Sequence, residues 1–196
     1  MKQNLLLATI LLSIIYSCKK DDTNITFTLP AKTQSGKNSF GFLKNSLVWT
    51  NYGRVCFPFA GGCRVNLKGT FYQSDGDIYI HADRVLDKVS TGHTMENIDL
   101  YLNTKFRGTQ TYSTFNKDSI GIGYYFTKRG EPMKTYFQAK SNPSLTIIIT
   151  KLDTINNILS GEFSGKLFRR ISDYSFETST TDSIILEDGR FDLKLK

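Results

Sequence analysis

Few residues of this chain are suited to catalysis by their type and spacing. The histidines are His81 and His93, and the sequence holds no G-x-S-x-G, H-E-x-x-H or G-x-x-x-x-G-K-[ST] segment. His81 falls on the polar side of a strand-like run and His93 lies in a polar stretch, so solvated roles fit both better than a general base. Asp99, Glu131 and Glu162 could supply the paired carboxylates of a glycoside hydrolase, which require a spatial separation and no sequence spacing. Nothing in the sequence singles out any of the three.

Metal and cofactor sites are not predicted. Ser74-Asp75-Gly76-Asp77 carries two carboxylates, but a hairpin turn explains each of its residues with fewer assumptions than a cation site. Gly121-Ile122-Gly123 superficially suggests a nucleotide-binding turn, yet it lies inside an apolar run and opens no helix. We therefore expect these glycines to serve strand packing.

The amino terminus carries the clearest chemical signal. Lys2 is followed by an apolar-dominated run from Leu5 to Ile15, and then by Ser17 and Cys18. As a helix this run would rise only about 16 Å, against about 30 Å of bilayer hydrocarbon. A positive start, a short apolar stretch and a small residue before the cleavage point are typical of a secretory signal peptide, here residues 1–17.

Cys18 stands where the cysteine of a bacterial lipoprotein is acylated. The segment ending at Cys18 resembles a lipobox, with Ile15 and Tyr16 where Leu and a small residue are usual. The resemblance implies cleavage before Cys18, diacylation of its sulfur and acylation of the new amine, which together anchor a protein stably to a membrane. The alternative is an ordinary signal peptide followed by an incidental cysteine. The string C-K-K-D-D at 18–22 resembles the tag that directs Bacteroidota lipoproteins to the outer face of the outer membrane.

Cys56 and Cys63 remain as a pair after lipidation of Cys18. In an oxidising, exported compartment such a pair predicts a disulfide, and Pro58 with Gly61-Gly62 gives the intervening loop the freedom to close. Zinc would need two further ligands, and the spacing is not that of C-x-x-C redox chemistry. The stapled loop either presents aromatic rings to a partner or closes a hairpin with its rings tucked in. The first alternative makes four residues candidate ligand contacts: Arg54, Phe57, Phe59 and Arg64.

Positive charge is concentrated early in the chain. The formal net charge is +7 over 196 residues, and residues 23–74 contain no Asp or Glu. Their cations are Lys32, Lys37, Lys44, Arg54, Arg64 and Lys68. On one face they would attract phosphate or carboxylate groups of lipopolysaccharide or an acidic glycan, whereas alternation along strands would scatter them. The export signal argues against a nucleic-acid partner.

From Ser39 onward the sequence predicts an all-β fold. Short runs that alternate apolar and polar residues are separated by turn signals, without a sustained 3.6-residue period. The expected turns are at Asn45-Ser46, Ser74-Asp75-Gly76, Asn156-Asn157 and Asp188-Gly189. We also expect a polar loop over 87–96 and a single helical turn over 82–89.

The pattern favours an antiparallel meander of about ten strands, closed into a sandwich or flattened barrel to cover its apolar faces. The expected organisation is a signal peptide (1–17), a lipidated tether (18–28) and a single all-β domain (29–196). The abundant rings, among them Trp49, Tyr52, Tyr124, Tyr125 and Tyr136, could form a sugar-stacking platform, but we expect them mainly in the core.

Two stretches resemble a family of uncharacterised Bacteroidota outer-membrane lipoproteins. The first is LPAKTQSGKNSFGFLKNSLVW at 29–49; the second comprises LTIIITKLDTINNILSGEFSGKLF and EDGRFDLKL near the carboxyl end. The resemblance implies location and fold only, because the activity of this family is unknown.

Together these observations predict a lipid-anchored, surface-exposed outer-membrane protein with a binding or structural role and no catalytic activity. No cofactor is expected. Its partners would be the membrane, through the anchor, and an envelope glycan, lipopolysaccharide or another envelope protein. The alternatives are a carboxylate-based hydrolase acting on glycans and a barrel that carries a small apolar ligand.

Overall fold

The computed structural model describes residues 24–57, 62–64, 66–88, 92–103, 108–113, 119–128, 135–139, 145–172, 175–176 and 183–195. Cys18 and Phe59 therefore lie outside the described residues, as does Glu131. No helix in these ranges has the length and hydropathy needed to cross a lipid bilayer.

Fourteen strands run through the described residues, more than the ten expected, because several are short. The first seven are β1 (Ser39–Lys44), β2 (Leu47–Thr50), β3 (Val55–Phe57), β4 (Gly62–Arg64), β5 (Leu67–Tyr72), β6 (Asp77–Lys88) and β7 (Gly92–Leu102). The others are β8 (Thr111–Ser113), β9 (Ile120–Lys128), β10 (Thr135–Ala139), β11 (Thr146–Asp153), β12 (Ile158–Ser172), β13 (Ser175–Phe176) and β14 (Ser183–Lys194).

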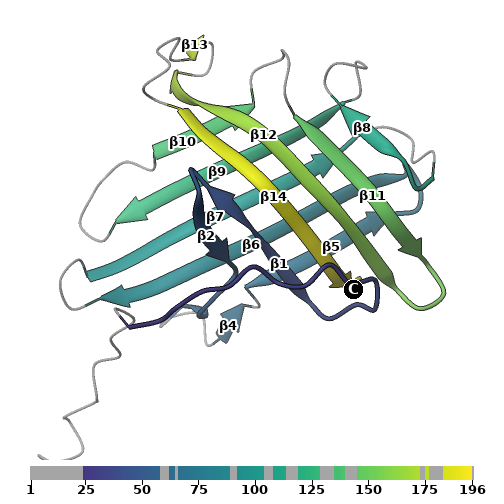
Figure 1. Ribbon diagram of the computed structural model, residues 1–196, viewed down its shortest axis with the longest axis horizontal. Helices are drawn as coiled ribbons and strands as arrows, with labels where there is room; N and C mark the ends of the chain where they lie inside the picture. The colour runs from purple at the N-terminus through teal and green to yellow at the C-terminus, as the bar shows by residue number, and fades with distance from the viewer. Residues whose placement is uncertain are drawn as a thin grey trace, which may run out of the picture.

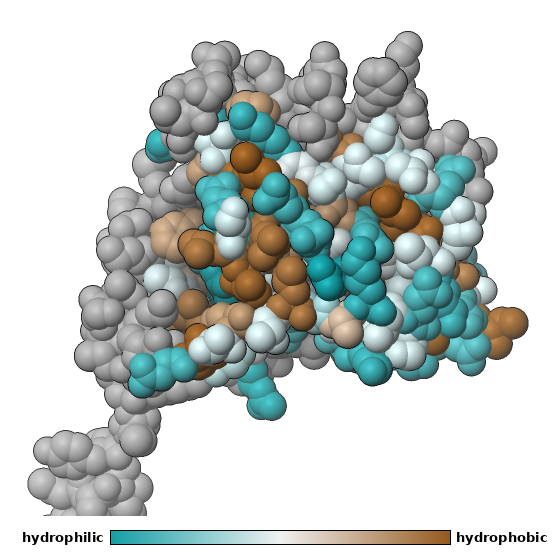
Figure 2. Space-filling view, viewed as in Figure 1, coloured by the Kyte–Doolittle hydropathy of each residue, from teal (hydrophilic) through white to brown (hydrophobic). Residues whose placement is uncertain are grey.

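The strands form a two-layered antiparallel sandwich, which confirms the predicted fold class. One hydrogen-bonded path runs β2-β1-β14-β12-β10-β9-β7-β6-β5, with β11 and β8 branching from β12. The long β12 belongs to both layers, because residues 158–164 pair with β11 and residues 167–169 pair with β10. Figure 1 shows β14, β12 and β11 crossing steeply over β9, β7, β6 and β5. We call the first group, with β1, β2 and β8, the front layer, and β10-β9-β7-β6-β5 the back layer. Figure 2 shows the molecule from the front-layer side, where hydrophobic and hydrophilic side chains lie next to one another.

The core lies between the layers and follows from period-two alternation. The front layer contributes most of the aromatic rings of the core, together with aliphatic chains, and Phe42 stacks on Trp49 at 4.9 Å between centroids. The back layer contributes mainly aliphatic chains: Ile78, Ile80, Ala82, Ile98, Leu100, Leu102 and Ile122. Trp49 and Tyr124 are buried in this core, as expected, and Tyr52 and Tyr125 are half-buried. The side chain of Tyr136 lies outside the described residues.

Local turn signals predicted three of the four hairpins. Asn45 and Ser46 both have positive φ between β1 and β2, and Gly76 has a φ of 73° in the β5–β6 turn. Asn157 has a φ of 56° before β12. The expected turn at Asp188-Gly189 is wrong, because β14 continues through it. Asp188 has a φ of 50° and lies in a β-bulge that shifts the register of β14 with both β1 and β12. Because β14 pairs with a strand on each side, the chain cannot reverse its direction there.

Two further expectations are wrong in the same region. Residues 82–88 form no helical turn, and most of the predicted polar loop over 87–96 is strand. β6 and β7 pair in continuous register from Ile78↔Leu102 to Lys88↔Gly92. Eleven cross-strand partners outweigh the weak strand preference of the charged residues in these strands.

The segment before β1 is fastened to the front layer by Asp192. Its carboxylate accepts hydrogen bonds from the Thr33 hydroxyl at 2.5 Å and the Ser160 hydroxyl at 2.7 Å. It also accepts them from the backbone amides of residues 35–37 at 2.8–3.2 Å. Burial by itself raises the pKa of Asp192, but these hydrogen bonds outweigh it and lower the pKa to about 2. Hydrogen bonds to the buried Asp192 carboxylate, in place of strand pairing, thus hold the segment before β1 against the front layer.

Candidate functional site

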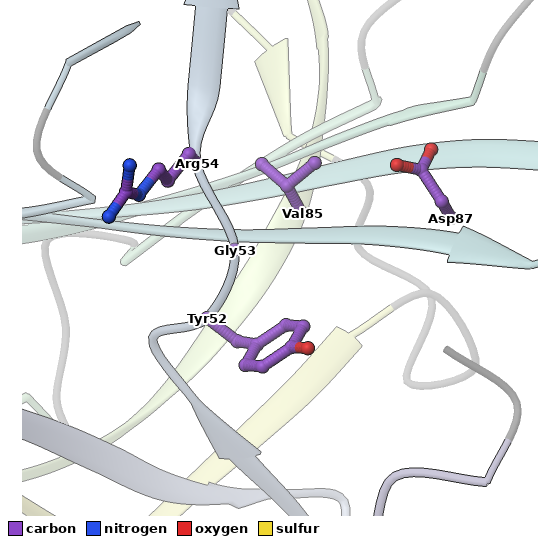
Figure 3. A pocket seen from close by; sticks show the side chains of 5 residues that line it. All are labelled: Tyr52, Gly53, Arg54, Val85 and Asp87. Atoms are coloured by element: carbon purple, nitrogen blue, oxygen red, sulfur yellow. The ribbon is translucent and has the colours of Figure 1, made fainter. Parts of the chain in front are cut away.

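A hollow of about 460 Å³ lies beside β6, next to the segment that leads into β3. The described residues lining it are Tyr52, Gly53, Arg54, Val85 and Asp87. Figure 3 shows the Arg54 and Asp87 side chains on opposite sides of Val85. The hollow therefore combines an apolar floor with a cationic group on one side and a carboxylate on the other. Arg54 is exposed and Val85 is buried.

Backbone hydrogen bonds hold the Tyr52–Arg54 segment against β6. The Tyr52 amide donates to the Asp83 carbonyl at 3.1 Å, and the Val85 amide donates to the Tyr52 carbonyl at 2.9 Å. Gly53 follows with a φ of 74°, and a Cβ on it would stand 2.6 Å from the Val85 carbonyl oxygen. Only glycine fits this close approach in the left-handed region. The guanidinium of Arg54 is thus presented from a fixed stretch of backbone.

The hairpin predicted to carry the disulfide begins directly after Arg54. β3 pairs with β4 so that Cys56 stands opposite Cys63, while Val55 stands opposite Arg64 and Phe57 opposite Gly62. Directly opposed residues of an antiparallel pair have Cα separations of about 4.5–5.5 Å, within the range that a disulfide spans. The side chains of these two strands lie outside the described residues, so the disulfide and the contacts of Phe57 and Arg64 stay predictions.

A second polar group lies on the outer face of the back layer. His81 Nδ1 is 2.6 Å from Asp99 Oδ1 and its Nε2 is 3.1 Å from Asp83 Oδ1. The Tyr79 hydroxyl donates to Asp99 at 2.7 Å, and the Asn97 amide donates to Asp83. Burial by itself lowers the pKa of His81, but Asp83 and Asp99 outweigh it and raise the pKa to about 9. A protonated imidazole between two carboxylates cannot accept a proton, so His81 is no general base at neutral pH.

A third polar group is enclosed between the layers. Glu96 accepts hydrogen bonds from Trp49 Nε1 at 2.5 Å and from Arg84 at 2.7 Å, and Lys44 Nζ stands 3.5 Å away. Lys44 also donates to the Tyr124 hydroxyl at 2.6 Å. Burial by itself raises the pKa of Glu96, but the charges of Lys44 and Arg84 outweigh it and lower the pKa. This group ties the β1–β2 hairpin to the back layer.

The remaining candidates for catalysis are not brought together. Asp99 lies on the outer face of the back layer, whereas Glu162 lies on β12 in the front layer, paired with Lys32 at 2.6 Å. His93 lies in β7, and its side chain is outside the described residues. In the part of the chain that the structure describes, no group of three or more His, Cys, Asp or Glu side chains could hold a metal ion.

The early cations are spread over the fold. Lys32 pairs with Glu162, Lys44 is enclosed beside Glu96, Arg54 borders the hollow and Lys68 is exposed on β5. Among the early cations whose side chains are described, Arg54 is therefore the one that lines the hollow.

Val85 and Asp87 were missed because a helical turn was expected over 82–89 and a polar loop over 87–96, where the structure has strand. The outward positions of β6 continue the same alternation through 83, 85 and 87, and that periodicity was the signal that could have found them.

One void between the two layers is small. A void bordered by Ile78, Ile80, Leu100, Ile147, Ile149 and Phe191 measures about 10 Å³. That is about the space of a single water molecule, and it offers no support for an apolar ligand carried there.

Comparisons with known proteins add no relative: no protein-family model matches the chain, and neither the curated proteins nor the solved structures contain a significant match.

Proposed function

We propose that this chain is a lipid-anchored protein of the outer membrane, exposed at the cell surface, with a binding role and no catalysis. The anchor rests on the apolar run before Cys18, and the binding role rests on the hollow beside Arg54. The hollow carries the proposal because it joins an exposed guanidinium to an apolar floor, whereas Asp99 and Glu162 lie on separate layers.

The chemistry of the hollow favours a ligand with an anionic group and an apolar or sugar body. A guanidinium binds phosphate and carboxylate in a fork geometry, and a buried Val85 floor gives the body of the ligand an apolar contact. Lipopolysaccharide and acidic envelope glycans present such groups, as do acidic segments of other envelope proteins. The predicted staple at Cys56 and Cys63 would keep the adjoining hairpin in one conformation.

Binding is tested with purified lipopolysaccharide as the probe and the unacylated mature chain, residues 18–196 with Cys18→Ser. We expect saturable binding that Arg54→Gln weakens about tenfold, the loss of one charge-assisted contact. Lys37→Gln is the matched control, because Lys37 is also an exposed cation of the acid-free segment but does not border the hollow. Equal weakening by both variants, or no binding, would overturn the role of the hollow.

The anchor is tested separately by metabolic labelling with palmitate and by membrane fractionation. Cys18→Ser should abolish the label and release the chain from the membrane, whereas Cys56→Ser should leave the label unchanged. Persistent labelling of the Cys18→Ser chain would contradict the anchor and leave the binding experiment unaffected.

A further inference from the structure

The outer face of the back layer carries an array of tyrosines and charged groups. The array lies farther along the same face than the hollow, whose β6 residues are Val85 and Asp87. Register places Thr70, Tyr79, Tyr101 and Gly121 in one row across β5, β6, β7 and β9. The next row is Lys68, His81, Asp99 and Gly123. Their inward neighbours Ile80, Leu100 and Ile122 are buried in the core, so both rows point outward.

Four tyrosines lie on this face: Tyr72, Tyr79, Tyr101 and Tyr125. Tyr72 is 48% exposed at the end of β5, and Tyr79 and Tyr101 are half-buried in the strands beside it. The ring of Tyr101 leans across β9 onto Gly121, because a Cβ on Gly121 would stand 1.9 Å from Tyr101 Cζ. The hydroxyl end of the Tyr101 ring therefore lies over the glycine. Tyr79 lies nearly parallel to the His81 ring, at 19° with 6.5 Å between centroids.

The polar groups among these rings are held in place. Asp99 is fixed by the Tyr79 hydroxyl at 2.7 Å and by His81 at 2.6 Å, yet its side chain keeps 21% of its surface exposed. A carboxylate has more acceptor sites than these two contacts use. Lys68 is exposed beside His81 and supplies donors. The donor Lys68 and the acceptor Asp99 thus lie in the row next to the one that contains Tyr79 and Tyr101.

The charge of the face distinguishes it from the rest of the chain. Its described cations are Lys68, His81 and, at the hollow, Arg54, and its carboxylates are Asp77, Asp83, Asp87 and Asp99. A chain with a formal net charge of +7 therefore has here a face with a small negative excess. Such a face repels polyanions weakly and suits hydroxyl groups, which both donate to carboxylates and accept from ammonium groups.

From these observations we infer that the outer face of β5, β6, β7 and β9 binds a neutral polysaccharide. Pyranose rings stack on Tyr72 and Tyr101, and their hydroxyls bond to Asp99 and Lys68. Flat rings on a rigid sheet lose little conformational entropy on binding, which favours an extended, hydroxyl-rich chain over a folded partner. The site is independent of Arg54, so the two binding activities can fail separately.

The test uses the unacylated mature chain and three uncharged probes: a β-glucan, an α-mannan and a xylan, each titrated by calorimetry. At least one should bind, with weak salt dependence because the polysaccharide itself carries no charged group. Tyr72→Ala and Tyr101→Ala should each weaken that binding about tenfold, the loss of one stacked ring. Circular dichroism and melting temperature identify a variant that has lost its fold.

The matched control is Leu47→Ala. Leu47 is 71% exposed on β2 of the front layer, so its truncation removes exposed apolar surface away from the tyrosines. Asp99→Asn, which keeps the shape of the side chain, should also weaken binding, while Arg54→Gln should not. The inference is overturned if none of the three polysaccharides binds, if the tyrosine variants bind as wild type does, or if Leu47→Ala weakens binding equally.

Discussion

The ring of Tyr101 on β7 rests on Gly121 of β9, its direct cross-strand partner, and leaves no room for a Cβ there. The sheet thus accommodates a large ring on its outer face by removing the neighbouring side chain. Gly121 lies in the Gly121-Ile122-Gly123 segment for which a packing role was predicted, and this contact confirms that prediction at Gly121.

Gly121→Ala should destabilise the fold by about 1 kcal/mol, because the methyl group displaces the Tyr101 ring from the strand. In a Tyr101→Ala background the same substitution should stabilise by a few tenths of a kcal/mol, since alanine restricts the unfolded chain more than glycine does. Urea unfolding of the two single variants and the double variant measures the coupling. Additive effects would contradict the contact.

Asp192→Asn should cost about 2 kcal/mol at neutral pH, because it removes the charge that five hydrogen bonds stabilise. The pKa of Asp192 is lowered in the folded state to about 2, so its contribution is present above the unfolded value of about 3.9. The contribution is lost as the pH falls through about 2. Unfolding free energies of both proteins should therefore converge between about pH 4 and pH 2. A difference that stays constant with pH would refute this role.

His81 should titrate in the folded protein with a pKa near 9. This value is raised above the unfolded 6.5, so the stabilisation is complete below about pH 6.5 and disappears as the pH rises through about 9. The chain contains two histidines, so imidazole NMR signals can be assigned with a His93→Gln variant. Asp99→Asn should lower the pKa of His81, because one of its two carboxylate partners becomes neutral. An unshifted titration near 6.5 would contradict the arrangement.

These groups also show what the sequence could and could not predict. Turn residues such as Asn45, Ser46 and Asn157 act locally, so their hairpins could be predicted from a few neighbouring letters. Asp188-Gly189 carries the same local signal, yet strands distant in sequence pair on both sides of it and convert the turn into a bulge. The local sequence specifies which backbone angles are allowed, and long-range strand pairing decides whether those angles form a hairpin turn or a β-bulge.

The polar groups were harder to predict for the same reason. Arg54 was a candidate because it adjoins a distinctive cysteine pair, whereas Asp87 and Asp99 gain their roles from strand register. Lys44 and Glu96 are 52 residues apart, and nothing local to either indicates that they share a buried site. Alternation predicted which side of the sheet residues 77–82 of β6 take, but it carries no information about the side chains that meet there.

Oxidation of Cys56 and Cys63 should appear as a mass loss of two hydrogen atoms in the unreduced mature chain carrying Cys18→Ser. On the chain-entropy relation, the eight-residue loop stabilises the fold by roughly 2.5 kcal/mol. Reduction should therefore lower the melting temperature of this chain and leave that of a Cys56→Ser, Cys63→Ser variant unchanged. Two thiols that alkylate without denaturant and reductant would refute the staple.

Glu96→Gln should be among the most damaging single substitutions, with a loss of about 3–5 kcal/mol. It leaves Lys44 and Arg84 enclosed without their carboxylate, and burial already lowers the pKa of Lys44. Lys44→Met removes one of the two cations and should cost less, because Arg84 and Trp49 still satisfy Glu96. Chemical unfolding of both variants gives the comparison. If Glu96→Gln were the milder of the two, the carboxylate would not be the group around which the two cations are held.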